Sequence, residues 1–235
     1  MAQLDYSSMT INTGQRVAVV TGSSSGIGFE TSLALARNGF HTFATMRNLE
    51  KSSNITEVSK NENLPLQAIQ LDVSNEKSVI EGINSISEEK GRIDVVVNNA
   101  GYDLIGPLEE TSMDEIKAQF ETNFFGAIRA MQVVIPLMRK QKSGRIVNIA
   151  SVGARIAISF HSGYHGTKFA LEGLSEFILY ELDPFGIKVI LVEPGAVGSR
   201  FWKNMKTAAK TSSLGNNSPY VEMANNMSEA LKQMV

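Results

Sequence analysis

Short apolar runs, rich in valine and isoleucine, alternate along the chain with longer segments of helical periodicity. Runs that are apolar at every position are typical of strands that helices cover on both faces of a sheet. These runs predict strands at residues 17–20, 40–45, 66–71, 93–97, 145–149 and 187–192. Apolar residues at helical spacing predict helices at residues 29–38, 75–89, 113–138 and 164–182.

The alternation of strands and helices predicts the fold class. Six strands with helical segments between them imply an α/β fold, a Rossmann-type doubly wound parallel sheet with helices on both faces. Ligands of such sheets bind beyond the carboxyl ends of the strands. Unusual polar, glycine and proline residues follow the predicted strands at that edge, namely Gly22, Asp72, Asn98, Ser151 and Pro194. We therefore expect the functional site there.

The pattern does not divide the chain into separate domains. Its 235 residues suit one large domain with a substantial core. The sequence contains no internal repeat, low-complexity tract or linker, so residues 1–235 are interpreted as a single domain. Residues 201–235 differ from the rest because they are polar, contain methionine and show no strand signal.

Composition narrows the function. Hydrophobic residues make up 43% and charged residues 20% of the chain, as is ordinary for a soluble protein. The formal net charge of -2 suggests neither a nucleic-acid nor a membrane surface. The absence of cysteine excludes disulfides and thiolate metal sites, and the three histidines lack metal-ligand spacing. No apolar run approaches the roughly 20 residues of a membrane span, and no signal peptide precedes Arg16, so a cytoplasmic location is expected.

A glycine-rich loop follows the first predicted strand. It contains the residues Gly22, Ser24, Ser25, Gly26, Ile27 and Gly28. Glycines here permit a tight turn and let the backbone approach a pyrophosphate, while the next helix offers N–H donors at its amino end. Because the strand before and the helix after are both present, a dinucleotide site is favoured over a plain glycine turn.

Arg47, after the second strand, bears on which dinucleotide binds. An acidic residue there would bind the ribose hydroxyls of NAD, but the sequence is Thr45-Met46-Arg47. An arginine suits the 2′-phosphate of NADP, although it could also be a solvated surface residue. NADP(H) is therefore expected over NAD(H), which stays possible. Asp72 and Val73 are placed to meet the adenine ring, and Asp72 could equally cap the helix that follows.

Tyr164 and Lys168 are candidates for proton transfer. They lie four residues apart and share one face of a predicted helix. A free tyrosine, with a pKa of about 10, is a poor base at neutral pH, and a nearby ammonium would lower that pKa. Ser151, after the fifth strand, could hydrogen-bond the same substrate oxygen. Alone, such a pair is more often structural, and its catalytic interpretation depends on the phosphate loop and Ser151.

Two further residues are weaker candidates. Asn123 interrupts the long predicted helix, where its amide could bind a backbone group or a water molecule. The functional interpretation is a water-held proton relay to Lys168, and the alternative is a neutral asparagine within a helix. His161 lies between Ser151 and Tyr164 and could line the mouth of a substrate pocket.

Together these residues resemble the short-chain dehydrogenases/reductases from about Arg16 to Phe201. The resemblance rests on Thr21-Gly-x-x-x-Gly-x-Gly28, Asp72-Val73, Asn98-Asn99-Ala100-Gly101, Asn123, Ser151, Tyr164-x-x-x-Lys168 and Pro194-Gly195. It implies that Asn123, Ser151, Tyr164 and Lys168 form the catalytic tetrad. It also implies that Asn99, Ala100 and Gly101 lie beside the adenosine ribose, that Val197 and Ser199 lie near the nicotinamide, and that Pro194 and Gly195 bind the cofactor.

Finer segments resemble the hydroxysteroid and retinol dehydrogenase branch, namely residues 43–48, 106–109, 151–153, 168–173 and 184–186. In that branch the residues matching Arg47 and Ser25 are associated with NADP, and substrates are apolar alcohols or ketones. Family members usually continue to a last helix and a seventh strand. Residues 200–235 are accordingly interpreted as a substrate loop or lid that lacks that strand.

The expected function is NAD(P)(H)-dependent interconversion of an alcohol and its ketone or aldehyde, with Tyr164 as the general acid and base. The alternative is a non-catalytic nucleotide-binding regulator on the same fold, which would be expected to lose the tyrosine or lysine. An epimerase or dehydratase would need a larger carboxyl-terminal domain. The resemblance also implies a homodimer or homotetramer formed by the helices at residues 113–138 and 164–182.

Overall fold

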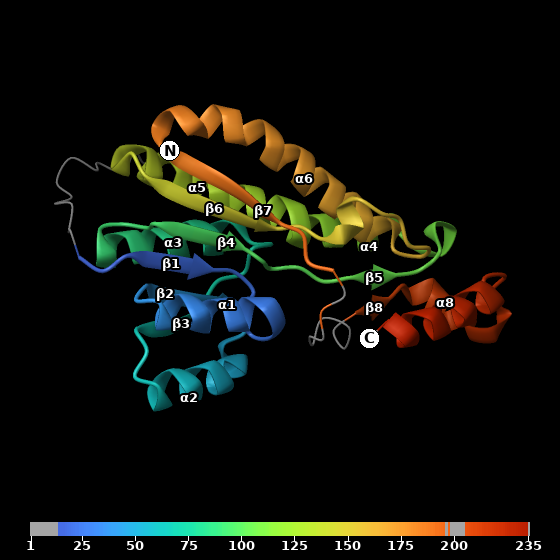
Figure 1. Cartoon of the computed structure of the whole chain (residues 1–235). Coiled ribbons are helices and arrows are strands. Elements are labelled where there is room, and N and C mark those ends of the chain that lie inside the picture. The colour runs from blue at the N-terminus through green and yellow to red at the C-terminus, as the bar shows by residue number, and fades with distance from the viewer. Residues whose placement is uncertain (1–13, 196, 198–204, 235) are drawn as a thin grey trace.

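The computed structural model of the chain describes residues 14–195, 197 and 205–234 (Figure 1). Its centre is a six-stranded sheet in the order β3-β2-β1-β4-β6-β7, in which all neighbouring strands are parallel. The strands are β1 (Val17–Val20), β2 (His41–Met46), β3 (Leu66–Gln70), β4 (Val95–Asn98), β6 (Gly144–Ile149) and β7 (Ile187–Val192). The predicted doubly wound fold is confirmed, and the strand order reverses at β1.

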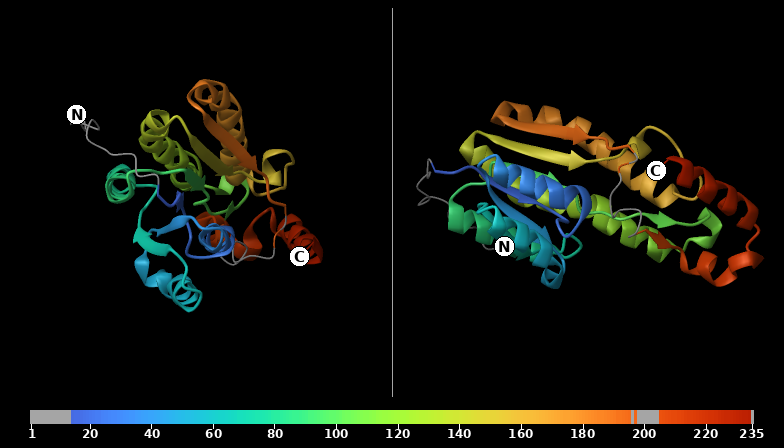
Figure 2. Two further views of the ribbon diagram at one scale, coloured as in Figure 1. Left: turned by 60° about the vertical axis from the view of Figure 1, so that its left-hand side comes forward. Right: turned by 60° about the horizontal axis from the view of Figure 1, so that its bottom comes forward.

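Six helices surround this sheet (Figure 2). They are α1 (Gly26–Arg37), α2 (Ser53–Asn61), α3 (Glu76–Lys90), α4 (Met113–Phe120), α5 (Gly126–Gln141) and α6 (Ser162–Leu182). The side chains of Val17 and Val19 share a core with α3, α5 and α6 on one face. Ala18 and Val20 point the other way and pack with Leu35 of α1. Burial on both faces explains why these strands are continuously apolar.

Two of the differences between the predicted and observed helices concern the site. Helix α1 begins at Gly26 rather than at residue 29, so the second half of the glycine loop forms the first helical turn. The helix predicted at residues 113–138 consists of α4, a π-helical turn (Glu121–Phe125) and α5. Asn123 therefore does interrupt the regular helix. Single π-turns of this kind occur frequently at functional sites.

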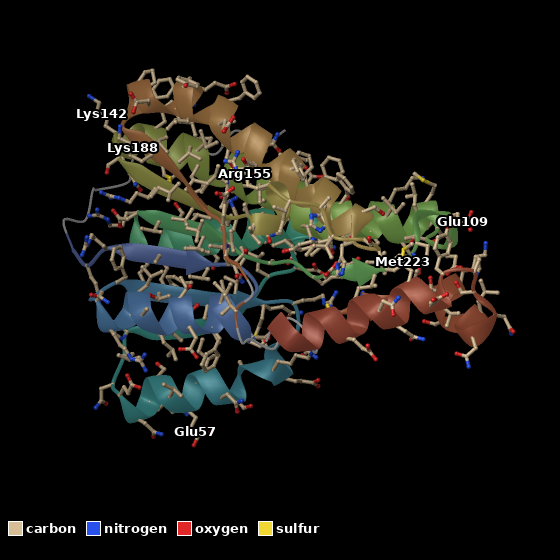
Figure 3. All side chains as sticks on the ribbon, turned by 45° about the vertical axis from the view of Figure 1, so that its right-hand side comes forward. Glu57, Glu109, Lys142, Arg155, Lys188 and Met223 are labelled. Atoms are coloured by element: carbon tan, nitrogen blue, oxygen red, sulfur yellow. The ribbon has the colours of Figure 1, made fainter. Side chains whose placement is uncertain are left out.

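The sequence pattern did not predict the elements at the carboxyl-terminal end. Strand β5 (Leu104–Ile105) pairs with β8 (Lys206–Thr207), and α7 (Ala209–Leu214) and α8 (Val221–Met234) follow. The part of the chain that the structure describes contains no seventh strand in the main sheet. In Figure 3, Met223 and Glu109 lie at one end of the molecule, and Lys142 and Lys188 lie at the other.

The carboxyl-terminal helices lie at the end of the molecule toward which the main strands run (Figure 1). That end is where ligands of doubly wound sheets bind. Among the described residues, no helix is both long and apolar enough to cross a bilayer.

Candidate active site

A cavity of about 510 Å³ opens at the carboxyl ends of the main strands. Most of the residues predicted to bind a dinucleotide line it, namely Gly22, Ser24, Ser25, Gly26, Ile27, Arg47, Asp72, Val73, Asn99, Ala100, Gly101, Tyr164, Lys168, Pro194, Gly195 and Val197. Segments distant in the sequence meet here because parallel strands present their carboxyl ends at one edge of the sheet. Ser199 lies outside the described residues.

At two positions of the loop, neighbouring atoms lie so close to the backbone that only glycine fits. Gly22 has a φ of 70°, and a Cβ there would lie 2.7 Å from the Cα of Ala100. Gly28 does not line the cavity, and a Cβ on it would lie 2.3 Å from Asn99 Nδ2 and 2.6 Å from the Gly22 carbonyl. Asn99 Nδ2 in turn donates to the carbonyls of Thr21 and Gly22, at 2.9 and 3.2 Å. The loop and the end of β4 thus form one tightly packed unit.

The start of α1 suits a phosphate group. Its N-cap residue Ser25 has an extended backbone and makes no capping hydrogen bond through its side chain. Gly26 and Ile27, in the first turn, line the cavity. The first N–H groups of a helix lack partners within the helix, and the helix dipole makes this end positive. The residues present therefore fit a dinucleotide at this position.

Asp72 is the one carboxylate among the described residues that line the cavity. Its Oδ1 accepts from the backbone N and the Oγ of Ser74, at 3.0 and 2.7 Å. The suggested capping role is wrong, because Asn75 is the N-cap of α3 and its side chain accepts from Ser78 N at 2.9 Å. Asp72 instead forms the turn that leads from β3 into the helix.

The sequence interpretation missed several residues of the cavity wall, namely Met46, Asn48, Lys51, Leu71, Tyr102, Thr122, Ile149, Ala150 and Lys206. Lys51 follows Arg47 by four residues and belongs to a short 3₁₀ helix (Leu49–Ser52). A basic residue close behind Arg47 was a readable signal. No sequence pattern indicated Lys206, because only the β5–β8 pairing brings this residue to the cavity.

Tyr164, Lys168 and Ser151 meet at the cavity end of α6. A side-chain hydrogen bond joins Ser151 to Tyr164, and Ser151 Oγ also accepts from Gly153 N at 3.0 Å. Lys168 is buried, and its Nζ lies 5.6 Å from the centre of the Tyr164 ring. That Nζ donates to the Ile149 carbonyl at 2.7 Å.

Burial controls the protonation of this group. It raises the pKa of Tyr164 to about 12, with a smaller opposing effect from the Ser151 hydrogen bond and a further increase from the charge of Asp103. The expected lowering of the tyrosine pKa by Lys168 is therefore not found. Burial also lowers the pKa of Lys168 to about 8. At neutral pH, Tyr164 consequently carries its proton.

Asn123 makes hydrogen bonds with protein groups. Its Oδ1 accepts from Tyr102 N at 3.0 Å, and its Nδ2 donates to Tyr102 O at 2.9 Å. The same Nδ2 donates to Thr167 Oγ1 at 3.2 Å. The backbone-binding alternative for this amide is confirmed, and a water relay to Lys168 stays a prediction. Asn123 fixes the segment after Gly101 against α6.

His161 is buried and does not line the main cavity. Its Nδ1 lies 2.7 Å from Oδ2 of Asp103, which is also buried. Asp103 was missed because a lone aspartate between a glycine loop and a strand gives no signal. Nearby His165 contacts the Gly153 carbonyl through Nδ1 and accepts from Ile158 N through Nε2. The contact of His161 with substrate stays a prediction.

Comparison with known proteins places this site in a family. Residues 16–210 match the sequence profile of the short chain dehydrogenases. The chain belongs to the short-chain dehydrogenase family. Members of this family are oxidoreductases that act on CH–OH groups with NAD(P), and the curated relatives of the chain include a hydroxysteroid dehydrogenase and retinol dehydrogenases.

Curated relatives of this short-chain dehydrogenase act on varied substrates. It is 37% identical over 88% of its length to a 3-ketodihydrosphingosine reductase of Bacteroides thetaiotaomicron, of which it covers 72%. It is 38% identical over 80% of its length to 17-beta-hydroxysteroid dehydrogenase type 1 of Mus musculus, and 40% identical over 79% to retinol dehydrogenase 8 of Bos taurus. The chain spans only 56% and 60% of these two mammalian proteins.

Solved structures agree with the fold. A short-chain dehydrogenase from Streptomyces avermitilis superposes with a TM-score of 0.80 at 33% identity, covering 92% of this chain and 78% of that one. A metagenomic short-chain oxidoreductase in complex with NADP gives a TM-score of 0.74 at 30% identity, covering 77% and 83%. A relative from Burkholderia phymatum, in complex with NAD, gives 0.77 at 25% identity, covering 80% and 68%. Structural relatives thus bind either nicotinamide dinucleotide.

Proposed function

We propose that this short-chain dehydrogenase interconverts an apolar alcohol and its ketone or aldehyde, with NADP(H) preferred and Tyr164 as the proton-transfer group. The observation that carries the proposal is the protonated, buried Tyr164, hydrogen-bonded to Ser151 and adjacent to Lys168 at the wall of the dinucleotide-sized cavity. A bound nicotinamide would supply or accept the hydride.

Different segments of the chain would bind different parts of the dinucleotide. The loop from Gly22 to Gly28 would hold the pyrophosphate at the start of α1. Asp72 and Val73 would meet the adenine, and Asn99 with the two residues after it would meet the adenosine ribose. Pro194, Gly195 and Val197 would also bind the cofactor, with Val197 near the nicotinamide. Their shared position on the cavity wall supports this assignment.

Tyr164 would donate its proton to the carbonyl oxygen in reduction and take it back in oxidation. Its raised pKa favours the donor form at neutral pH. Ser151, already bonded to Tyr164, would orient the same oxygen. The positive charge of Lys168 would stabilise the phenolate left by the transfer. Asn123 would act by fixing the backbone around Tyr102, to which it is bonded twice.

Arg47 supports a preference for NADP(H). It lines the cavity after β2, and Lys51 adds a second positive charge to the same wall. A guanidinium offers a forked set of donors that matches a phosphate. The one carboxylate of the described wall, Asp72, follows β3 rather than β2. It therefore does not occupy the position expected for an NAD-selecting acid.

An apolar substrate is supported by the curated relatives, whose names specify a ketodihydrosphingosine, a hydroxysteroid and a retinol. The carboxyl-terminal residues 205–234 would act as the substrate lid, because β8 pairs with β5 close to the site.

We also propose a homodimer or homotetramer. Phe169, Phe177 and Tyr180 of α6 are 51%, 73% and 77% exposed, and sedimentation would show whether they are covered.

A paired titration with NADPH and NADH, followed by nicotinamide fluorescence, tests the proposal. We expect NADPH to bind more tightly. Arg47→Ala should remove most of that preference, by roughly 10-fold or more, because a charged hydrogen bond contributes about 1.5–3 kcal/mol. A reductive screen of apolar carbonyls then measures turnover. Equal or tighter binding of NADH would contradict the preference, and binding without turnover of any carbonyl or alcohol would favour a regulatory protein.

A further inference from the structure

Besides Lys168, three cationic side chains from separate elements line the dinucleotide cavity. Arg47 follows β2, Lys51 lies in the 3₁₀ helix after it, and Lys206 belongs to β8. The one carboxylate of the described wall, Asp72, is already engaged by Ser74. The wall therefore carries an excess of positive charge, as a site for a multiply charged anion requires. The role proposed above accounts for Arg47 but leaves Lys206 unexplained.

Backbone contacts fix the position of Lys206. Its N–H donates to the Asp103 carbonyl at 2.9 Å, and Ala208 N donates to the Ile105 carbonyl at 2.8 Å. Ala208 is fully buried, and a Cβ added to Gly106 would lie 2.7 Å from its side chain. The β5–β8 pair thus holds this part of the carboxyl-terminal segment against the residues that follow β4.

The ammonium of Lys206 lies on an aromatic ring of the same wall. Its Nζ is 4.3 Å from the centre of the Tyr102 ring. The Tyr102 carbonyl accepts from both Asn123 Nδ2 and Gln119 Nε2, so the backbone below the ring is fixed. Burial raises the pKa of Tyr102, and the charge of Arg47 opposes that rise.

We propose that Lys206 is a phosphate-binding residue of the dinucleotide site, supplied by the carboxyl-terminal segment. This inference rests on the proposed function, since it needs a dinucleotide in the cavity. A cation–π contact at an exposed position is worth only about 0.5–1 kcal/mol, whereas a charge-assisted bond to phosphate is stronger. The ammonium can therefore exchange the ring for a phosphate oxygen. The pyrophosphate and the 2′-phosphate share this chemistry.

Calorimetric titration of NADPH and NADH into the intact protein tests the inference without any turnover. We expect Lys206→Gln to weaken binding by about 10-fold, as the loss of one charge-assisted bond implies. Lys206→Arg should retain most of the affinity because it keeps the charge. Lys210→Gln is the matched control, since Lys210 lies nearby on α7, is exposed and does not line the cavity. Its binding should change by less than about 2-fold, because exposed charges are screened.

The two dinucleotides distinguish the two phosphates. A loss confined to NADPH supports contact with the 2′-phosphate, and an equal loss for both supports contact with the pyrophosphate. Unchanged binding by Lys206→Gln, with Arg47→Ala still weakening NADPH, would overturn the inference and leave the proposed function standing. Equal losses of affinity in Lys206→Gln and Lys210→Gln would overturn the inference, because they would show a general effect of removing positive charge. Failure of the unaltered protein to bind either dinucleotide would contradict both proposals.

Discussion

The two walls of the cavity are built by different means. The wall formed by the β1–α1 turn depends on backbone contact, because Gly22 and Gly28 leave no room for a side chain. The wall formed by α6 and the end of β6 depends on buried ionisable groups, Tyr164 and Lys168. The first wall presents backbone N–H groups in a well-packed turn. The second wall buries the ammonium of Lys168, and burial of a charge lowers the stability of the fold.

The largest effect should follow a change in the second wall. Tyr164→Phe removes the phenolic proton but keeps the ring that Lys168 faces. We expect turnover to fall by about 10²–10⁴-fold, the usual contribution of general acid–base catalysis, with NADPH binding nearly unchanged. Steady-state kinetics and a binding titration on the same preparation check both statements. Surviving turnover would mean that another group donates the proton.

Lys168→Met should show that the second wall costs stability. A pKa lowered from 10.5 to about 8 corresponds to roughly 3 kcal/mol of unfavourable burial at pH 7. Loss of the bond to the Ile149 carbonyl offsets about 1 kcal/mol, so the variant should be about 2 kcal/mol more stable at pH 7. Urea unfolding measures this difference.

The pH dependence gives the control for that measurement. Between pH 8 and 10.5 the unfolded lysine is protonated while the folded one is neutral. The unaltered protein therefore gains stability as pH rises through this window, and the methionine variant does not. The advantage of the variant should vanish by about pH 10. A constant difference across the window would show that the pKa of Lys168 is the same in the folded and unfolded states, as for a fully solvated lysine.

The same contrast decides what the sequence could predict. Strands that are apolar on both faces and a glycine loop with fixed spacing predicted the first wall and the sheet, because local pattern determines them. The shift in the pKa of Tyr164 was predicted in the wrong direction, because the prediction considered the charge of Lys168 but not the burial of the tyrosine itself. Asp103 and Lys206 reach the site through β5 and β8, which pair across 102 residues, and such long-range pairing leaves no mark in two-residue strands.

A smaller effect should follow a change in the first wall. An alanine at position 28 would force its Cβ against Asn99 Nδ2 and the Gly22 carbonyl. Overpacking of this kind costs about 1–3 kcal/mol, part of which the better helix propensity of alanine offsets. We expect Gly28→Ala to lower the free energy of unfolding and to weaken NADPH and NADH equally, because under the proposed function the distorted turn would hold the pyrophosphate that both share.

Gly173→Ala is the matched control for this prediction. Gly173 also lies inside a helix, α6, but a Cβ there would meet nothing within 4 Å. Only the propensity gain remains, so this variant should be more stable by about 0.5–1 kcal/mol and should bind both dinucleotides as before. If both alanine variants gained stability alike, the turn would have room to relax. The first wall would then hold the cofactor by flexible contacts rather than by a fixed backbone shape.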